Sequence, residues 1–211
     1  MDSKSCSYPF VHQSKPNSCG AACLLMVYMH LGLSNVTEKE IFENVSGNTG
    51  RIFERNCRTH LMVQDALNRE LIASSLFANA TREAILTAHA HDIDLILLAR
   101  RNPALLFGHF YVVSNATAGQ VYLLDPMGTE KPVHFPYAEL DERMVSKGLP
   151  EDDIQTSRTM IAVSAHASNS STIICPYCKS SVPVFNDLFP CYNLALCPTC
   201  DRTFDPHHVS L

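Results

Sequence analysis

A cysteine opens an apolar run near the start of the chain, with an amide side chain six residues before it, in the segment Gln13–Gly20. Cysteine attacks carbonyl groups as a thiolate, and the positive end of a helix lowers the pKa of a thiol placed there. The oxygen that becomes negative during acyl transfer can be stabilised by the Cys19 backbone N–H and the Gln13 amide. We therefore predict a Cys19 nucleophile with Gln13 in an oxyanion hole, and we expect Gly20 to leave room for a substrate backbone.

The alternative for Cys19 is a buried structural role, which is the commoner role of cysteine. Cys23, one helical turn later in the apolar run, fits that role better.

A thiol nucleophile needs a base, and His109 is the best placed of ten histidines. It opens an alternating run to Ser114, which is followed by turn-forming residues and a second run ending at Asp125. A hairpin with Ser114 opposite Gln120 sets His109 opposite Asp125, at a Cβ separation of about 4.5–5.5 Å. Asp125 is then predicted to orient the imidazole that accepts the Cys19 proton. Seven of the other histidines show no comparable partner and are interpreted as surface or core residues: His12, His30, His60, His89, His91, His134 and His166.

Two CxxC pairs, Cys175/Cys178 and Cys197/Cys200, are separated by 18 residues. Four thiolates satisfy tetrahedral zinc, and a module of about 40 residues is too small for a robust apolar core. We predict one structural Zn²⁺ per chain, with strand pieces at Val182–Phe185 and Thr203–Phe204. Redox-active pairs are the alternative, but the βαβ context of thioredoxin-type motifs is absent.

Other side chains near these pairs are spare ligands at most. Cys191 is expected to pack beneath the ribbon, and His207 and His208 are additional potential ligands. Lys179 and Arg202 are the only basic residues after position 171, which favours a protein partner over nucleic acid for this module.

Composition bounds the class of protein. The chain has 211 residues, 46% of them hydrophobic, and a formal net charge of −5, which disfavours a broad basic surface for nucleic acid. The longest apolar stretch, Ala21–Leu33, is interrupted and is shorter than the ~20 residues of a membrane span. Because no membrane span is expected, we expect no membrane partner. The polar start is unlike a secretory signal, so the nine cysteines indicate a reducing, cytoplasmic location.

The elements that must position these residues fall into helices first and strands afterwards. Helices are predicted over Cys19–Leu31 with Ser18 as N-cap and Gly32 in a left-handed cap, from the capping box at Thr37, over Thr59–Leu71 and over Thr81–His91. Strands are predicted at Leu95–Ala99, Ala104–Phe107, His109–Ser114, Val121–Leu124, Val133–Phe135 and Met160–Ser164. This order is typical of an α+β domain with an antiparallel sheet.

A small polar tract separates the two cysteine groups. We predict a domain over residues 1–166, a linker over 167–171 and a zinc ribbon over 172–211.

The ordered set Gln13, Cys19, His109 and Asp125 resembles the motifs of the bacteriocin-processing, double-glycine-leader peptidases, a branch of the papain-like cysteine peptidases. The resemblance spans roughly residues 8–165. It implies a papain-like fold, in which the Cys19 helix packs against a sheet bearing His109 and Asp125, and cleavage of a peptide bond through a thioacyl intermediate.

Three functions follow from these residues. The leading hypothesis is a cysteine peptidase, or an isopeptidase, acting on a peptide or protein substrate. A papain-fold acyltransferase or amidase would use the same side chains on another acceptor or amide. A non-catalytic protein that recruits partners through the ribbon is the third, and it would have an unreactive Cys19.

Overall fold

The structure is a computed structural model, which describes residues 8–48, 55–78, 80–102, 108–144, 158–166 and 169–209. Its α-helices are α1 Cys19–His30, α2 Glu38–Val45, α3 Thr59–Asn68, α4 Thr81–Ala90 and α5 Tyr137–Met144. None of the helices in these ranges is long and apolar enough to pass through a bilayer.

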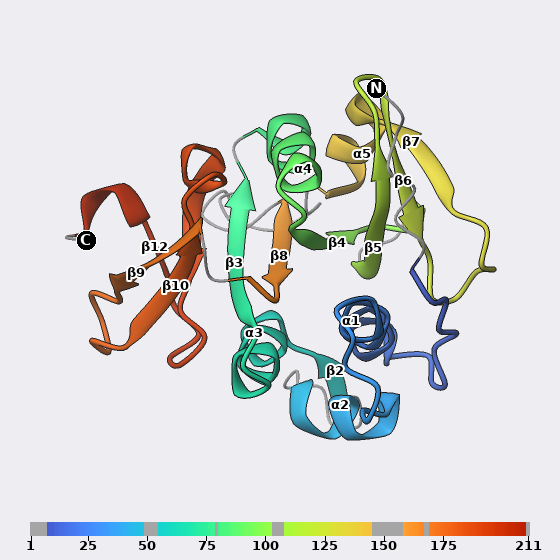
Figure 1. Cartoon of the computed structure of the whole chain (residues 1–211), viewed down its shortest axis with the longest axis horizontal. Coiled ribbons are helices and arrows are strands. Elements are labelled where there is room, and N and C mark those ends of the chain that lie inside the picture. The colour runs from blue at the N-terminus through green and yellow to red at the C-terminus, as the bar shows by residue number, and fades with distance from the viewer. Residues whose placement is uncertain are drawn as a thin grey trace.

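The main sheet of the described ranges has eight strands in the order β12-β11-β3-β8-β4-β5-β6-β7, and each neighbouring pair is antiparallel (Figure 1). These strands are β3 Ile72–Ala78, β4 Asp94–Ala99, β5 His109–Ala116, β6 Gln120–Leu124, β7 Val133–Pro136, β8 Thr159–Ser164, β11 Tyr192–Leu196 and β12 Thr203–Phe204. Two hairpins are separate from it: β1 Ser46–Asn48 with β2 Arg55–Cys57, and β9 Ser170–Ile174 with β10 Ser181–Phe185.

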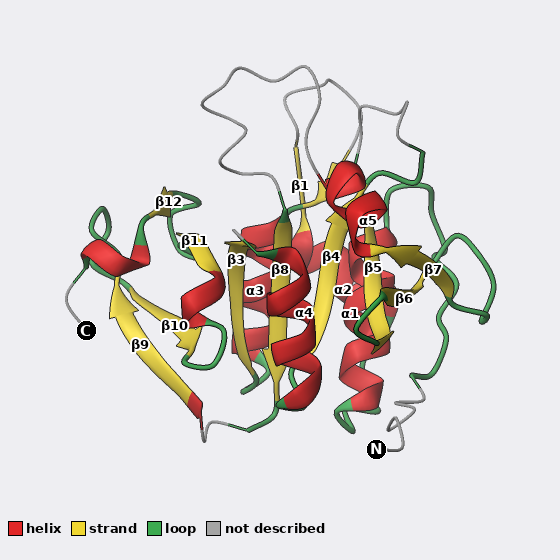
Figure 2. Ribbon diagram, turned by 90° about the horizontal axis from the view of Figure 1, so that it is seen from above, coloured by secondary structure: helices red, strands yellow, loops and turns green. Residues whose placement is uncertain are grey.

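The sheet is covered on both faces. Helices α1, α2 and α3 lie on one face and α4 and α5 on the other (Figure 2). Alternation along β4 shows the division, because Ile96 packs with the α1 core while Leu95 and Leu97 pack with the α4 core. The strands that carry the candidate site are therefore held from both sides.

The C-terminal cysteine segment is continuous with this sheet. Strand β11 pairs with β3, and Tyr192 and Phe204 belong to the same buried core as α4. Strand β9 begins at Ser170, inside the expected linker, and residues 167–168 lie outside the described ranges. The division into a domain and a ribbon remains a proposal, since the two parts share backbone hydrogen bonds and a core.

Most predicted elements are present within one to three residues. Helix α1 ends at His30, and Gly32, two residues later, has the expected left-handed backbone with φ +89°. Thr37 caps α2, because its side chain accepts a hydrogen bond from the Glu40 N–H. The described α-helices and strands that were not predicted are β1, β2, β3, α5, β9 and β11. The strand expected at Ala104–Phe107 lies outside the described residues. Strand β3 has adjacent serines at its centre, which resemble a turn in sequence. Ser74 is buried there because its hydroxyl bonds the Tyr192 hydroxyl at 2.6 Å.

The predicted register of the β5–β6 hairpin is wrong. Val113 pairs with Leu123, where Val121 was expected, because β5 continues to Ala116 and contains a bulge after Val113. The shift near the start of β5 is two residues. Since side chains alternate with a period of two, an even shift leaves each residue on its expected face. His109 and Asp125 thus become diagonal neighbours on one face, where directly opposed residues were expected.

Candidate active site

Cys19 is the first residue of α1, and its side chain is half-buried. The helix is apolar on nearly every side and is buried from Gly20 to Tyr28, so its position is fixed by the surrounding core. Ser18 occupies the N-cap position, yet its hydroxyl makes no capping hydrogen bond. It bonds Lys15 O at 3.0 Å and Glu38 Oε1 at 2.6 Å. The first N–H groups of α1 are therefore left for other acceptors.

One such acceptor is Cys57 in β2, a residue that the sequence analysis did not single out. Its sulfur accepts backbone hydrogen bonds from Gly20 and Ala21, although burial is the larger effect and raises the pKa of Cys57 to about 12. Cys57 is thus a neutral thiol beside Cys19.

The expectation for Gly20 is wrong, because its missing side chain faces the protein. A Cβ there would lie 2.7 Å from Cys57 Cβ and 2.9 Å from Met62 Sδ. Gly20 is needed for the close approach of α1 to β2 and α3, and no space for a substrate backbone is required to explain it.

His109 and Asp125 meet as a buried pair. His109 Nε2 donates to Asp125 Oδ1 at 2.8 Å, and each residue is only 6% exposed. This leaves Nδ1 for the hydrogen bond between His109 and Cys19. The structure therefore brings together the three predicted residues Cys19, His109 and Asp125, in the order thiol, imidazole, carboxylate.

The charges around this chain favour a protonated imidazole. Burial opposes the positive charge, but the hydrogen bonds with Asp125 and Cys19 outweigh it and raise the pKa of His109. Burial likewise opposes the Asp125 carboxylate, but donation from His109 and from the Met127 N–H lowers its pKa. Asp125 thus remains ionised and keeps the imidazole in the orientation that faces the thiol.

Arg101 also binds the Asp125 carboxylate, and the sequence analysis did not single this residue out. Its Nε donates to Asp125 Oδ2 at 3.0 Å, while Oδ1 takes His109 and the Met127 N–H at 2.8 Å each. The backbone of Arg101 is itself fixed by Arg143 of α5, whose Nη1 donates to Arg101 O at 2.6 Å.

Gln13 is buried and lies in the segment that precedes α1. Its backbone N–H donates to Pro126 O at 2.9 Å, which ties this segment to the residue after Asp125. Its Nε2 donates to Lys15 O at 2.6 Å, and its buried Oε1 has no hydrogen-bond partner among the residues that the structure describes. One Nε2 proton is engaged by Lys15, so the second is the one that can serve an oxyanion.

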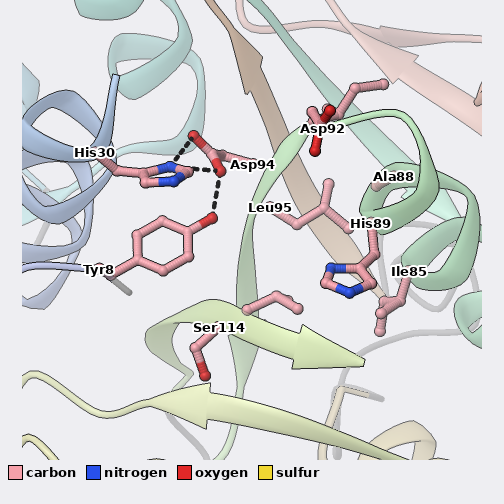
Figure 3. A pocket seen from close by; sticks show the side chains of 11 residues that line it. Tyr8, His30, Ile85, Ala88, His89, Asp92, Asp94, Leu95 and Ser114 are labelled. Carbon is pink, nitrogen blue, oxygen red and sulfur yellow. Dashed lines mark hydrogen bonds and ion pairs between the residues drawn. The ribbon is translucent and has the colours of Figure 1, made fainter. Parts of the chain in front are cut away.

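A second His–Asp pair lies at the other end of α1, where the sequence analysis found no partner for His30. His30 Nδ1 lies 3.1 Å from Asp94 Oδ1, which also accepts a hydrogen bond from the Tyr8 hydroxyl (Figure 3). The Tyr8 and His30 rings are 4.3 Å apart between centroids. His30, Asp94 and Tyr8 line a small pocket, and none of the described residues that line it is a cysteine. The His30–Asp94 pair therefore has no thiol to activate.

The four predicted ligand cysteines are brought together in the C-terminal segment. The sulfurs of Cys175, Cys178, Cys197 and Cys200 all lie within 4.8 Å of one another, with Cys175–Cys200 at 3.8 Å and Cys178–Cys197 at 3.6 Å. A tetrahedron with Zn–S bonds of about 2.3 Å has edges of about 3.8 Å. The donor set and its spacing therefore fit a four-coordinate metal ion.

The spare ligands are engaged elsewhere. Cys191 is buried in the core beneath this cluster, as expected. His207 Nε2 lies 2.9 Å from Tyr192 O, and His208 pairs with Asp205 at 3.3 Å.

Solved structures with similar folds include two peptidases. The peptidase domain of Streptococcus ComA, a bi-functional ABC transporter of a quorum-sensing pathway, gives a TM-score of 0.52 at 18% identity, covering 75% of this chain and 99% of that one. A protein described as a C39-like peptidase from Bacillus anthracis gives 0.55 at 11% identity, covering 78% and 97%. No protein-family model matches the chain, and no curated protein matches its sequence significantly. The likenesses confirm the expected papain-like fold, with α1 against an antiparallel sheet.

Proposed function

We propose that the protein is a cysteine peptidase that hydrolyses a peptide or isopeptide bond. The observation that carries this proposal is the hydrogen-bonded chain from Cys19 through His109 to Asp125, at the start of a buried helix. The fold is similar to those of the ComA peptidase domain and of the Bacillus anthracis protein described as a C39-like peptidase.

In the first half-reaction, His109 Nδ1 takes the Cys19 proton and the thiolate attacks the carbonyl carbon of the scissile bond. The carbonyl oxygen becomes negative, and the Cys19 backbone N–H and the free Nε2 proton of Gln13 donate to it. The tetrahedral intermediate collapses as the imidazolium gives its proton to the leaving amine. The product is a thioester on Cys19 and a free amino fragment.

In the second half-reaction, neutral His109 takes a proton from water while the hydroxide attacks the thioester carbonyl. The C–S bond then breaks, and the imidazolium returns the proton to the departing thiolate. Asp125 remains a carboxylate throughout and stabilises the imidazolium formed twice in each cycle.

A panel of peptide and ubiquitin-like probes with a C-terminal electrophile tests this function and separates peptide from isopeptide substrates. We expect one covalent adduct, located at Cys19 by mass spectrometry, and no adduct in the Cys19→Ala protein. Cleavage of a matched peptide by correctly folded Cys19→Ala would contradict the proposal. Adding an amine tests for acyl transfer, because a transferase accumulates amine adducts whereas a peptidase releases the acid.

We also propose that the cysteine cluster binds one structural Zn²⁺. Cys175 and Cys178 come from one knuckle and Cys197 and Cys200 from the other, and the ion would join the two. A site closed by four thiolates has no open position for a substrate, so no catalytic step is assigned to it.

Native mass spectrometry and elemental analysis of the purified protein test this site. We expect one zinc per chain, lost in Cys197→Ser and retained in Cys191→Ser, which removes a buried cysteine outside the cluster. A folded, monodisperse wild-type protein without metal would contradict the site.

A reducing, cytoplasmic location fits this chemistry, because none of the eight cysteines in the described ranges forms a disulfide. The exposed side chains of Ile174 and Tyr177 at the first knuckle are consistent with a protein partner for the module.

A further inference from the structure

The two cysteine knuckles differ in the residue that directly follows the second cysteine, which is Lys179 in the first knuckle and Asp201 in the second. The residue after the second cysteine of each pair has a left-handed backbone, with φ +64° at Lys179 and φ +56° at Asp201. Lys179 Nζ donates to Pro176 O at 2.9 Å, within its own knuckle. Asp201 instead reaches α3: Arg58 Nη2 lies 3.1 Å from Oδ2 and His60 Nδ1 lies 2.8 Å from Oδ1.

The residues that Asp201 contacts are close in sequence to Cys57, which packs against the start of α1. Arg58 directly follows Cys57, whose sulfur accepts the N–H groups of Gly20 and Ala21. The Cys57 thiol also lies 3.7 Å from Asn17 O, in the turn that leads into α1. A short continuous segment, residues 57–60, thus links the second knuckle to the first turn of the helix that begins with Cys19.

This segment is closely packed against α1. Position 20 accepts only glycine without a shift of its neighbours, because a Cβ there would overlap Cys57 and Met62. A displacement of β2 or of the start of α3 is therefore transmitted to the backbone on either side of Cys19. The Asp201 contacts are 16–39% exposed, so they add little to global stability, whereas a shift of about 1 Å at a reacting group can cost about 10²-fold in rate.

We propose that Asp201 is a positioning residue for Cys19, acting through Arg58, His60 and Cys57. The C-terminal module thereby holds the first turn of the catalytic helix in place. This inference rests on the proposed function for the meaning of Cys19 reactivity, but it can be tested on the thiol itself.

The test compares Asp201→Gly with Lys179→Gly. Glycine suits the left-handed backbone at both positions, and both variants keep all four cysteines. The measured quantities are the rate of Cys19 alkylation, kcat and KM on a cleaved peptide, and zinc content. We expect Asp201→Gly to lower the alkylation rate and kcat by about 2- to 30-fold with KM little changed, while Lys179→Gly stays near wild type. Asp201→Asn, which keeps an acceptor, should recover part of the loss.

Arg58→Met supplies an independent arm, because it breaks the Arg58–Asp201 ion pair without touching the knuckle and keeps the His60 contact. It should reproduce part of the loss, and its combination with Asp201→Gly should be no worse than Asp201→Gly alone. This variant decides the matter if Asp201→Gly also loses zinc.

Equal Cys19 alkylation rates in wild type and Arg58→Met would overturn the inference and leave the proposed function standing. A wild-type Cys19 no more reactive than the other thiols would instead remove the proposed function, and with it the role given to Asp201.

Discussion

Helix α1 has a histidine–carboxylate pair at each end, and the two pairs differ in what surrounds them. At its start, His109 bonds Asp125 at 2.8 Å and also bonds Cys19. Roughly 17 Å away at its end, His30 lies 3.1 Å from Asp94, with the Tyr8 hydroxyl on the same carboxylate. A carboxylate that orients an imidazole is therefore not sufficient to identify a catalytic site.

The difference lies in the third group and in the polarity of the helix. The start of α1 favours a negative charge and presents a thiol, so a proton can pass to His109 and leave a nucleophile. The end of α1 favours a positive charge, and the nearby third group is the phenol of Tyr8. A protonated His30 is therefore held between Asp94 and the Tyr8 ring. These differences support the proposed catalytic role of the first pair and an anchoring role of the second pair for the N-terminal segment.

The largest expected effect separates the two histidines by activity. His109→Ala should lower kcat/KM by about 10⁴-fold or more, because the thiol loses its base. Cys19→Ala should have an effect of the same size, because the thiol itself is removed. His30→Ala should keep activity within a few-fold of wild type. Peptide hydrolysis by the three purified variants checks this, with circular dichroism as the control for folding. Comparable losses in His30→Ala and His109→Ala would remove the distinction.

The next effect concerns two residues of the segment that leads into α1, one near each pair. Gln13→Ala should lower kcat by about 10²–10³-fold, because one donor to the oxyanion is lost. Tyr8→Phe should leave kcat nearly unchanged, since its hydroxyl bonds Asp94, the carboxylate at the other end of α1. Steady-state kinetics on one peptide compares them. A small effect of Gln13→Ala would leave the oxyanion to backbone donors.

A smaller effect is expected on which thiol reacts first. Burial raises the pKa of Cys23 well above its ordinary value and that of Cys57 to about 12, so neither should compete near pH 6. Brief alkylation at that pH should label Cys19 at least about tenfold faster than these two thiols. The advantage should disappear in His109→Ala and persist in His30→Ala, as peptide mapping would show. Preferential labelling of Cys57 would contradict the assignment.

The smallest effect is a pH dependence of stability at the distal pair. The hydrogen bond with Asp94 raises the pKa of His30, burial opposes the rise, and the nearby charges of Asp94 and Asp92 add to it. The protonated form is thus favoured by folding, and its contribution is complete below about pH 6.5 and is lost as pH rises through the raised pKa. His30→Asn should cost about 0.3–1 kcal/mol at pH 5.5 and less at pH 8.5.

Urea unfolding of wild type and His30→Asn at both pH values measures this difference. A cost that grows with pH would have the wrong sign for a protonated His30. Asp94→Asn is the matched variant, since it removes the carboxylate and keeps the imidazole.

The site was predictable where the signal is local. Cys19 at the start of an apolar helix, and His109 and Asp125 in one hairpin, are each visible within short segments. The even register error did not disturb the pair, because a shift of two residues preserves the face. Arg101 and Cys57 were not predictable, since Arg101 follows β4 and Cys57 ends a short hairpin strand, and only the tertiary fold brings them to Asp125 and to α1.

The fold was predictable to the same extent. Helices α1 to α4 and strands β4 to β8 carry clear periodicity and turn signals. Strand β3 was missed because its serines are buried by a partner, Tyr192, that lies far along the chain. The joining of the cysteine segment to the sheet was missed for the same reason, because antiparallel pairing between distant strands leaves no mark within either strand.

That joining has a consequence for how the chain folds. Strand β3 pairs with β8 on one side and with β11 on the other, so both of its partners lie late in the sequence. Pairings of such long sequence separation are slow to form, and until β11 arrives β3 has an unpaired edge bearing Leu76 and Phe77. Residues synthesised much later than β3 therefore protect an aggregation-prone edge made early. A chain interrupted before Tyr192 should be more prone to aggregate than to persist as a shorter active protein.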